Sequence, residues 1–185
     1  MVYLPSCKYM QICWVVPDLH RAIEHWARQA GVGPFFYFDE VVYENAVYRG
    51  KPWQPVKFHA AIAQAGAMQI ELVSQLEDGP SMFSELVAPG ESRLHHMSTY
   101  TDNFAGDLQH YLDHGAEVVF TGLMKGAPVC WLDTVASLGF MTELITANPE
   151  RRRSSRCSGR PPPTGTGSIR SAGCDARWQT TTGTN

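Results

Sequence analysis

The stretch Gln11-Ile12-Cys13-Trp14-Val15-Val16-Pro17-Asp18 (QICWVVPD) opens a pattern that occurs twice in this chain of 185 residues. Its apolar run of β-branched and aromatic residues predicts a strand. Asp18 is a suitable N-cap for the helix predicted next, whose apolar residues recur at helical spacing, and Gly31 is its natural stop. Three further strands are predicted after this helix, over 41–49, 56–65 and 68–74.

The second copy of the pattern begins at His96, with a predicted strand over 97–101. Asn103 then caps a predicted helix that stops at Gly115. The two copies agree in spacing, because Asp18 precedes His25 by seven residues and Asn103 precedes His110 by seven. The second copy is predicted to end in strands over 117–121, 127–133 and 140–146.

A repeat of about 85 residues is too long for a solenoid repeat. It predicts an α+β fold made of two βαβββ modules in tandem, over residues 1–80 and 81–150. We expect the modules to form a pseudo-symmetric, cupped mixed sheet around a central cavity. The modules could pair within one chain or be exchanged between two chains, and we expect a homodimer.

The composition is that of an ordinary globular protein, with 44% hydrophobic and 18% charged residues. No apolar run approaches the roughly 18 residues that span a bilayer, and no signal peptide is visible. The five cysteines are scattered and form no CxxC motif, which argues against a disulfide framework or a cysteine zinc site. These features predict a cytoplasmic protein that binds no membrane.

Residues 151–185 differ from the rest of the chain. They contain seven Arg, no Lys and one acid, and only six of these 35 residues are apolar. This composition predicts a disordered basic tail. Its abrupt start after Glu150 suggests an aberrant sequence, such as a reading-frame change. Nucleic-acid binding is not expected, because the acidic remainder of the chain offers no companion surface.

Two glutamates stand at equivalent places in the last strand of each copy. Glu71 lies between Ile70 and Leu72, and Glu143 lies between Thr142 and Leu144. Because side chains alternate along a strand, each carboxylate is expected on the face opposite to these neighbours. A buried carboxylate is costly unless it is paired or binds a metal ion.

In its order of motifs the chain resembles the vicinal oxygen chelate superfamily, which includes glyoxalase I, methylmalonyl-CoA epimerase, extradiol dioxygenases and bleomycin-resistance proteins. The resemblance covers roughly residues 8–148. It rests on these stretches: residues 11–18, 31–35, 70–72, 95–96 and 139–145. It implies that one divalent metal ion (Zn, Ni, Mn, Fe or Co) is bound by Gln11, Glu71, His96 and Glu143.

Such a donor set suits a six-coordinate divalent ion with two places left for a substrate that has adjacent oxygens. The predicted function is a glyoxalase-like lyase or isomerase that acts through an enolate-type intermediate on a small, fairly apolar molecule. Glu143 is the candidate catalytic base, with Glu71 as the second candidate. The candidate substrate contacts are His59, Trp14, Phe38 and Trp131.

Two alternatives remain open. The first is a metal-free protein that sequesters a hydrophobic or aromatic molecule, as bleomycin-resistance members do. The second is an acyl-CoA epimerase, which predicts a basic patch for the nucleotide phosphates, whereas residues 1–150 have eight Lys and Arg against 17 acids. The glutathione-binding features of glyoxalase I are not visible, since Val15 stands where that family has an Arg. A dioxygenase is disfavoured because the ligand set holds a single His.

Overall fold

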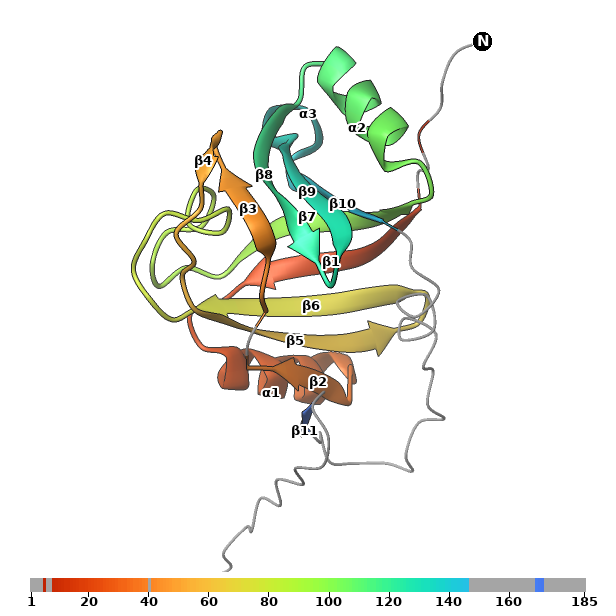
Figure 1. Cartoon of the computed structure of the whole chain (residues 1–185). Helices are drawn as coiled ribbons and strands as arrows, with labels where there is room; N and C mark the ends of the chain where they lie inside the picture. The colour runs from red at the N-terminus through yellow and green to blue at the C-terminus, as the bar shows by residue number, and fades with distance from the viewer. Residues whose placement is uncertain (1–4, 6–7, 40, 147–168, 172–185) are drawn as a thin grey trace, which may run out of the picture.

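The computed structural model describes residues 5, 8–39, 41–146 and 169–171. Within these ranges, eleven strands form one open mixed sheet in the order β11-β2-β5-β6-β1-β7-β10-β9-β8-β3-β4. Figure 1 shows the two halves of this sheet meeting at β1 and β7, with α1 outside one half and α2 outside the other. None of the helices in the described residues has the length and apolar character needed to cross a membrane.

The first module confirms the predicted order of strand, helix and three strands. Its helix begins after Asp18, whose side chain accepts a hydrogen bond from the backbone N–H of Arg21 at 3.0 Å. The helix ends at Gly31, which adopts a left-handed conformation with φ of 67°. The elements are β1 (Tyr9–Val15), α1 (Leu19–Ala30), β2 (Phe35–Phe38), β5 (Phe58–Ala65) and β6 (Met68–Gln75).

The second module repeats this order. Its helix is capped by Asn103, as predicted, and the side chain of Asn103 accepts a hydrogen bond from the N–H of Gly106. The elements are β7 (Arg93–Thr101), α2 (Phe104–Asp113), β8 (Glu117–Met124), β9 (Ala127–Asp133) and β10 (Met141–Thr146), with the short helix α3 (Val135–Leu138) before the last strand.

The two modules pair within one chain. β1 runs parallel to β6 and antiparallel to β7, and β7 in turn runs parallel to β10. The order β2-β5-β6-β1 therefore continues into β7-β10-β9-β8, which is the same order reversed. This arrangement is the pseudo-symmetric mixed sheet that the repeat predicts.

The prediction for one strand of the first module, over 41–49, is wrong about its place in the sheet. The segment 41–49 is predicted as the second strand of the first module, but β2 takes that place beside β5. The segment instead forms β3 (Glu44–Tyr48), which pairs with β8 of the second module and with β4 (Lys51–Pro52). Local sequence gives a strand propensity but cannot specify which distant edge the strand joins.

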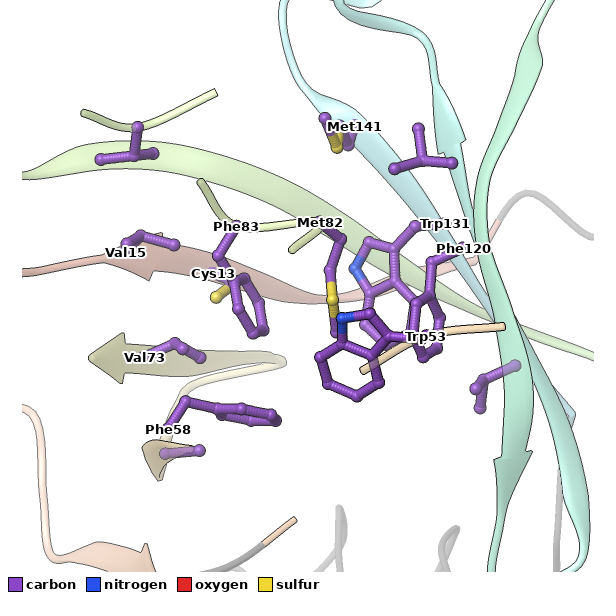
Figure 2. Close-up of a cluster of buried hydrophobic side chains, with 14 of the residues drawn as sticks. Cys13, Val15, Trp53, Phe58, Val73, Met82, Phe83, Phe120, Trp131 and Met141 are labelled. Atoms are coloured by element: carbon purple, nitrogen blue, oxygen red, sulfur yellow. The ribbon is translucent and has the colours of Figure 1, made fainter. Parts of the chain in front are cut away.

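Within the described part of the chain, three apolar clusters hold the layers together. One lies beneath α1 and includes Leu19 and Leu72, and another lies beneath α2 and includes Leu132 and Leu144. The largest, which we call the inner cluster, lies on the opposite face of the sheet and fills much of the space predicted as a central cavity (Figure 2). Its largest members are Trp53, Phe58, Met82, Phe83, Phe120 and Trp131.

The prediction for residues 151–185 falls largely outside the described residues. The exception is β11 (Ile169–Ser171), which pairs in parallel with β2 at the edge of the sheet.

Candidate metal centre

The register of the central strands places Gln11 and Glu143 on one face of the sheet. Gln11 in β1 is the Cα partner of Ser98 in β7, and Ser98 is the Cα partner of Glu143 in β10. Paired residues on neighbouring strands point to the same face. All three side chains are at least 96% buried.

The other two predicted ligands lie one row along the same face. Cys13 in β1 is the Cα partner of Glu71 in β6 and of His96 in β7. Since Cys13 is two residues from Gln11, both rows point to the inner side of the sheet. The structure therefore brings Gln11, Glu71, His96 and Glu143 together at the seam between the modules.

A β-bulge aims two adjacent histidines at this seam. Cys13 pairs with His96, but the next residue, Trp14, pairs with Leu94, so His95 is the extra residue on β7. Neighbouring residues of a regular strand point to opposite faces, whereas here His95 Nδ1 lies 2.9 Å from His96 Nδ1. Both histidines are buried.

A chain of hydrogen bonds connects Gln11, Ser98 and Glu143, the row of paired residues described first. Gln11 Nε2 donates to Gln69 Oε1 at 2.9 Å. Ser98 Oγ lies 2.9 Å from Gln11 Oε1 and 2.5 Å from Glu143 Oε2. A hydroxyl has a single proton, so Ser98 donates to one of these oxygens at a time and holds both in place beside β7.

His96 lies between the two carboxylates. Its Nε2 is 3.3 Å from Glu71 Oε2 and 3.3 Å from Glu143 Oε2, within ion-pair distance. Nevertheless, this buried nitrogen has no hydrogen-bond partner of good geometry. Burial by itself lowers the pKa of His96, but Cys13, Glu143 and Glu71 together outweigh it and hold the pKa well above its ordinary value.

The partners of His95 determine the orientation and tautomer of His96. His95 Nε2 donates to the carbonyl oxygen of Met82 at 2.8 Å. Burial, together with the charge of His96, lowers the pKa of His95 to about 3, so His95 is neutral and its Nδ1 is an acceptor. His96 Nδ1 must therefore be the donor between the rings, which directs its Nε2 towards Glu71 and Glu143.

Cys13 was not predicted as a site residue. Its thiol and ligand atoms of Glu71 and His96 all lie within 4.8 Å of one another. Burial raises the pKa of the Cys13 thiol to about 12, with smaller opposing effects of His96 and Glu71. The apolar context of Ile12 to Val16 predicts a strand but conceals this role, because it gives no indication of which side chains the register places opposite Cys13.

The predicted substrate contacts divide into two pairs. Trp131 packs on the ring of His96 at a centroid distance of 5.8 Å, and Phe38 packs against the inner cluster. The structure does not bring Trp14 to the candidate centre, since it lies against Trp26 beneath α1. His59 also lies elsewhere, because it alternates with inner-face residues of β5 and its Nδ1 is hydrogen-bonded to the hydroxyl of Tyr37.

Side chains cover the candidate centre. Figure 2 shows Phe83 beside Cys13, and Met82 between Phe83 and Trp131, in the inner cluster. Two surface hollows, of about 280 and 120 Å³, lie elsewhere and are lined by none of the four predicted ligands. Glu71 is the most exposed of the four predicted ligands: its side chain is 16% exposed, whereas those of His96 and Glu143 are 1% and 4% exposed and Gln11 is buried.

The fold and the site define a protein of tandem βαβββ modules with a largely buried group of side chains at the module seam whose types can bind a metal ion. A family described as the "Glyoxalase/Bleomycin resistance protein/Dioxygenase superfamily" matches residues 10–131. The chain therefore belongs to this superfamily, to which the vicinal oxygen chelate proteins belong. The comparison with curated proteins found no match.

Several solved structures share the fold. Methylmalonyl-CoA epimerase from Mycobacterium tuberculosis is 15% identical in sequence and has a TM-score of 0.55. The match covers 83% of this chain and 97% of the epimerase chain. A hypothetical protein from Bacillus halodurans is 17% identical, with a TM-score of 0.58 and coverages of 76% and 94%. A methylmalonyl-CoA epimerase variant from Streptomyces coelicolor is 20% identical, with a TM-score of 0.51 and coverages of 77% and 95%.

Proposed function

We propose that this chain is a metal-dependent lyase or isomerase of glyoxalase type, acting on a small, fairly apolar substrate with adjacent oxygens. Gln11, Glu71, His96 and Glu143 would hold one divalent ion, for which zinc, nickel, manganese, iron and cobalt are candidates. When bound, the ion supplies Lewis-acid chemistry that stabilises negative charge developing on the substrate oxygens.

The observation that carries this proposal is the environment of His96 Nε2. A buried nitrogen without a hydrogen-bond partner is rare in folded proteins and calls for an explanation. Here it faces oxygens of two carboxylates at 3.3 Å, and its ring is held in the orientation that a metal ligand needs. Nitrogen and oxygen donors that converge in this way fit a divalent cation.

Glu143 is the better placed of the two carboxylates to exchange a proton with a substrate carbon. Ser98 and His96 both lie against its Oε2, which leaves Oε1 as the oxygen that a substrate proton would reach. The bond from Ser98 also fixes the orientation of the carboxylate. Glu71 is the second candidate, and its greater exposure favours a ligand role over a protected base.

The surroundings favour an apolar substrate. Trp131 supplies aromatic surface against His96, and Phe38 packs against the same inner cluster. Trp131 Nε1 is a second buried atom without a hydrogen-bond partner. An indole N–H can only donate, so Trp131 is suited to a substrate oxygen. Reaching this region requires a substrate to displace side chains of the inner cluster.

The two alternatives from the sequence gain different amounts of support. The aromatic inner cluster favours a metal-free binding protein as the second candidate, because an apolar molecule that displaced some of its side chains would be surrounded by aromatic surface. An acyl-CoA epimerase is suggested by the names of the fold relatives, yet Arg49, a partly buried cation, is already paired with Glu85, Glu117 and Asp133. A homodimer in the cytoplasm remains our expectation.

Metal content tests the proposal most directly. The full chain is purified without a His-tag, and divalent metals per chain are counted by mass spectrometry. We expect about one ion per chain, lost in His96→Ala and retained in His25→Ala, which changes an exposed helical histidine. No bound ion, even after incubation with each of the five candidate metals, would contradict the proposal and favour the binding protein.

Activity on hydroxy-carbonyl substrates provides the second test. We expect it to vanish with a chelator and to fall by about 10²–10⁴-fold in Glu143→Gln, because the amide cannot accept the substrate proton. The metal content of Glu143→Gln should be measured alongside, since this separates loss of the base from loss of the ion. Activity that survives both treatments would refute the proposed mechanism.

A further inference from the structure

The candidate centre contains a thiol that the predicted ligand set does not include. Cys13 is fully buried, and its sulfur and ligand atoms of Glu71 and His96 lie within 4.8 Å of one another. The proximity follows from the strand register, because Cys13 is the Cα partner of both residues. Three different donor types, sulfur, oxygen and nitrogen, therefore meet from three adjacent strands.

A second observation indicates that this group binds a ligand. His96 is only 1% exposed, and its Nε2 has no hydrogen-bond partner. This nitrogen faces Glu71, which belongs to the same group of donors. Cys130 provides a contrast within the same fold. It is also buried and free, but it packs with Leu132 and Leu144 beneath α2 and is not among the donor atoms that meet at Glu71 and His96.

We propose that Cys13 binds the metal ion through its thiolate, together with Glu71 and His96, and thereby makes the centre selective for zinc-like ions over manganese. This inference rests on the proposed function, in that an ion must bind at His96. Zinc accepts cysteine sulfur at about 2.3 Å and histidine nitrogen at about 2.0–2.1 Å. Donors already within 4.8 Å of one another need only small side-chain rotations to reach one ion.

The chemical consequence is a change in metal preference. Thiolate is a soft ligand that favours zinc and cobalt, whereas carboxylates and amides suit manganese. Binding releases the thiol proton to solvent, since the sulfur coordinates as a thiolate. A centre with one sulfur donor would thus hold zinc or cobalt more tightly than a centre with oxygen and nitrogen donors alone.

Cobalt spectroscopy on a single-thiol chain tests the inference. The full-length variant Cys7→Ser, Cys130→Ala, Cys157→Ser, Cys174→Ser keeps Cys13 as its one thiol. After addition of Co²⁺ under anaerobic conditions, we expect one bound ion per chain and a near-ultraviolet thiolate-to-cobalt charge-transfer band. Additional replacement of Cys13 by Ala should abolish this band.

Metal affinities provide the quantitative comparison. We expect the affinity of the otherwise wild-type chain for Zn²⁺ to fall by about 10–100-fold in Cys13→Ala, while its affinity for Mn²⁺ changes much less. Cys130→Ala is the matched control and should leave both affinities unchanged. Equal losses for the two ions would contradict the selectivity, because they would show a general disturbance of the centre.

The outcomes separate this inference from the proposed function. Stoichiometric Co²⁺ without a charge-transfer band would overturn the role of Cys13 and leave the metal centre intact. If the wild-type chain binds no Co²⁺, both the role of Cys13 and the proposed metal centre are overturned. If the single-thiol chain does not fold, zinc X-ray absorption of wild type and Cys13→Ala decides instead. A sulfur neighbour at about 2.3 Å in wild type, lost in the variant, is expected, and nitrogen and oxygen neighbours alone would refute the inference.

Discussion

His95 and His96 are adjacent in sequence, yet the structure gives them different roles. His96 faces the carboxylates of Glu71 and Glu143, whereas His95 is hydrogen-bonded to His96 and to the carbonyl of Met82. A partner on the second ring nitrogen fixes the tautomer and ring orientation of a metal-binding histidine. His95 is therefore a positioning residue for the proposed centre.

Replacement of His95 should show this indirect role. We expect His95→Leu to lower zinc affinity by about 10–100-fold, because the ring of His96 loses the acceptor that orients it. His95→Gln should recover much of the affinity, since its amide can accept from His96 Nδ1 and donate to Met82. Titration calorimetry measures the affinities.

Nitrogen NMR of the histidine rings separates positioning from a general loss of stability. We expect a single Nδ1–H tautomer of His96 in wild type and in His95→Gln when His96 is neutral, and a mixture of tautomers in His95→Leu. An unchanged tautomer together with weakened binding would contradict the positioning role.

At the scale of elements, the segment between β2 and β5 connects the two modules. β3 leaves the first module and pairs with β8, where Tyr48 is the Cα partner of Phe120. Arg49 follows β3 and makes two hydrogen bonds of 2.8 Å to the carboxylate of Glu85, in the segment between β6 and β7. Tyr48 donates to the same carboxylate at 2.7 Å. These contacts tie together three parts of the chain that lie far apart in sequence.

The ion pair between Arg49 and Glu85 should make the free energy of unfolding depend on pH in the acidic range. The hydrogen bond from Arg49 is the main cause that holds the pKa of Glu85 below its ordinary value of 4.5. A depressed pKa in the folded state stabilises the fold above 4.5, and this contribution is lost as the pH falls through the folded-state pKa. We expect Glu85→Gln to lose up to about 1 kcal/mol of unfolding free energy at neutral pH.

Urea unfolding at neutral and acidic pH measures this effect. The difference between wild type and Glu85→Gln should shrink in acid, where the wild-type carboxylate is also neutral. Glu77→Gln is the control, because Glu77 lies 3.6 Å from Lys57 in a largely exposed pair. A constant difference between wild type and Glu85→Gln across this pH range would show that the ion pair is not its cause.

At the scale of the whole molecule, the inner cluster joins the modules. Trp131 of the second module is 1% exposed and packs edge-to-face on Phe120, Tyr43 and His96. The cluster also includes Phe58 from the first module. Because the candidate centre lies at the same seam, the packing that stabilises the fold also shields His96 and Glu143 from water, with side chains that are 1% and 4% exposed.

Truncation at this position should therefore destabilise the whole chain. We expect Trp131→Ala to lower the unfolding free energy by about 3–5 kcal/mol, because it leaves a large cavity in a packed core. Leu76→Ala, at a site that is 51% exposed, should change it by less than about 0.5 kcal/mol. Chemical denaturation of the metal-free chains measures the unfolding free energies. Similar decreases for Trp131→Ala and Leu76→Ala would contradict a central role of Trp131.

The sequence by itself determined the tandem modules and the positions of their helices. Local signals were sufficient there, because Asp18, Gly31 and Asn103 act within one helix turn and apolar periodicity reports the buried face. The equivalence of the two glutamates also followed from sequence. The register confirms it, since Gln11 pairs with the residue two before Glu71 and His96 pairs with the residue two before Glu143.

Only the tertiary structure decided the details that depend on partners distant in sequence. It placed β3 beside β8 rather than beside β5, because several sheet edges can accept one short strand. It introduced the bulge that turns both His95 and His96 inward, which an alternating pattern cannot predict. It also placed Cys13 opposite Glu71 and His96, because register across strands depends on the packing of the whole sheet rather than on any one segment.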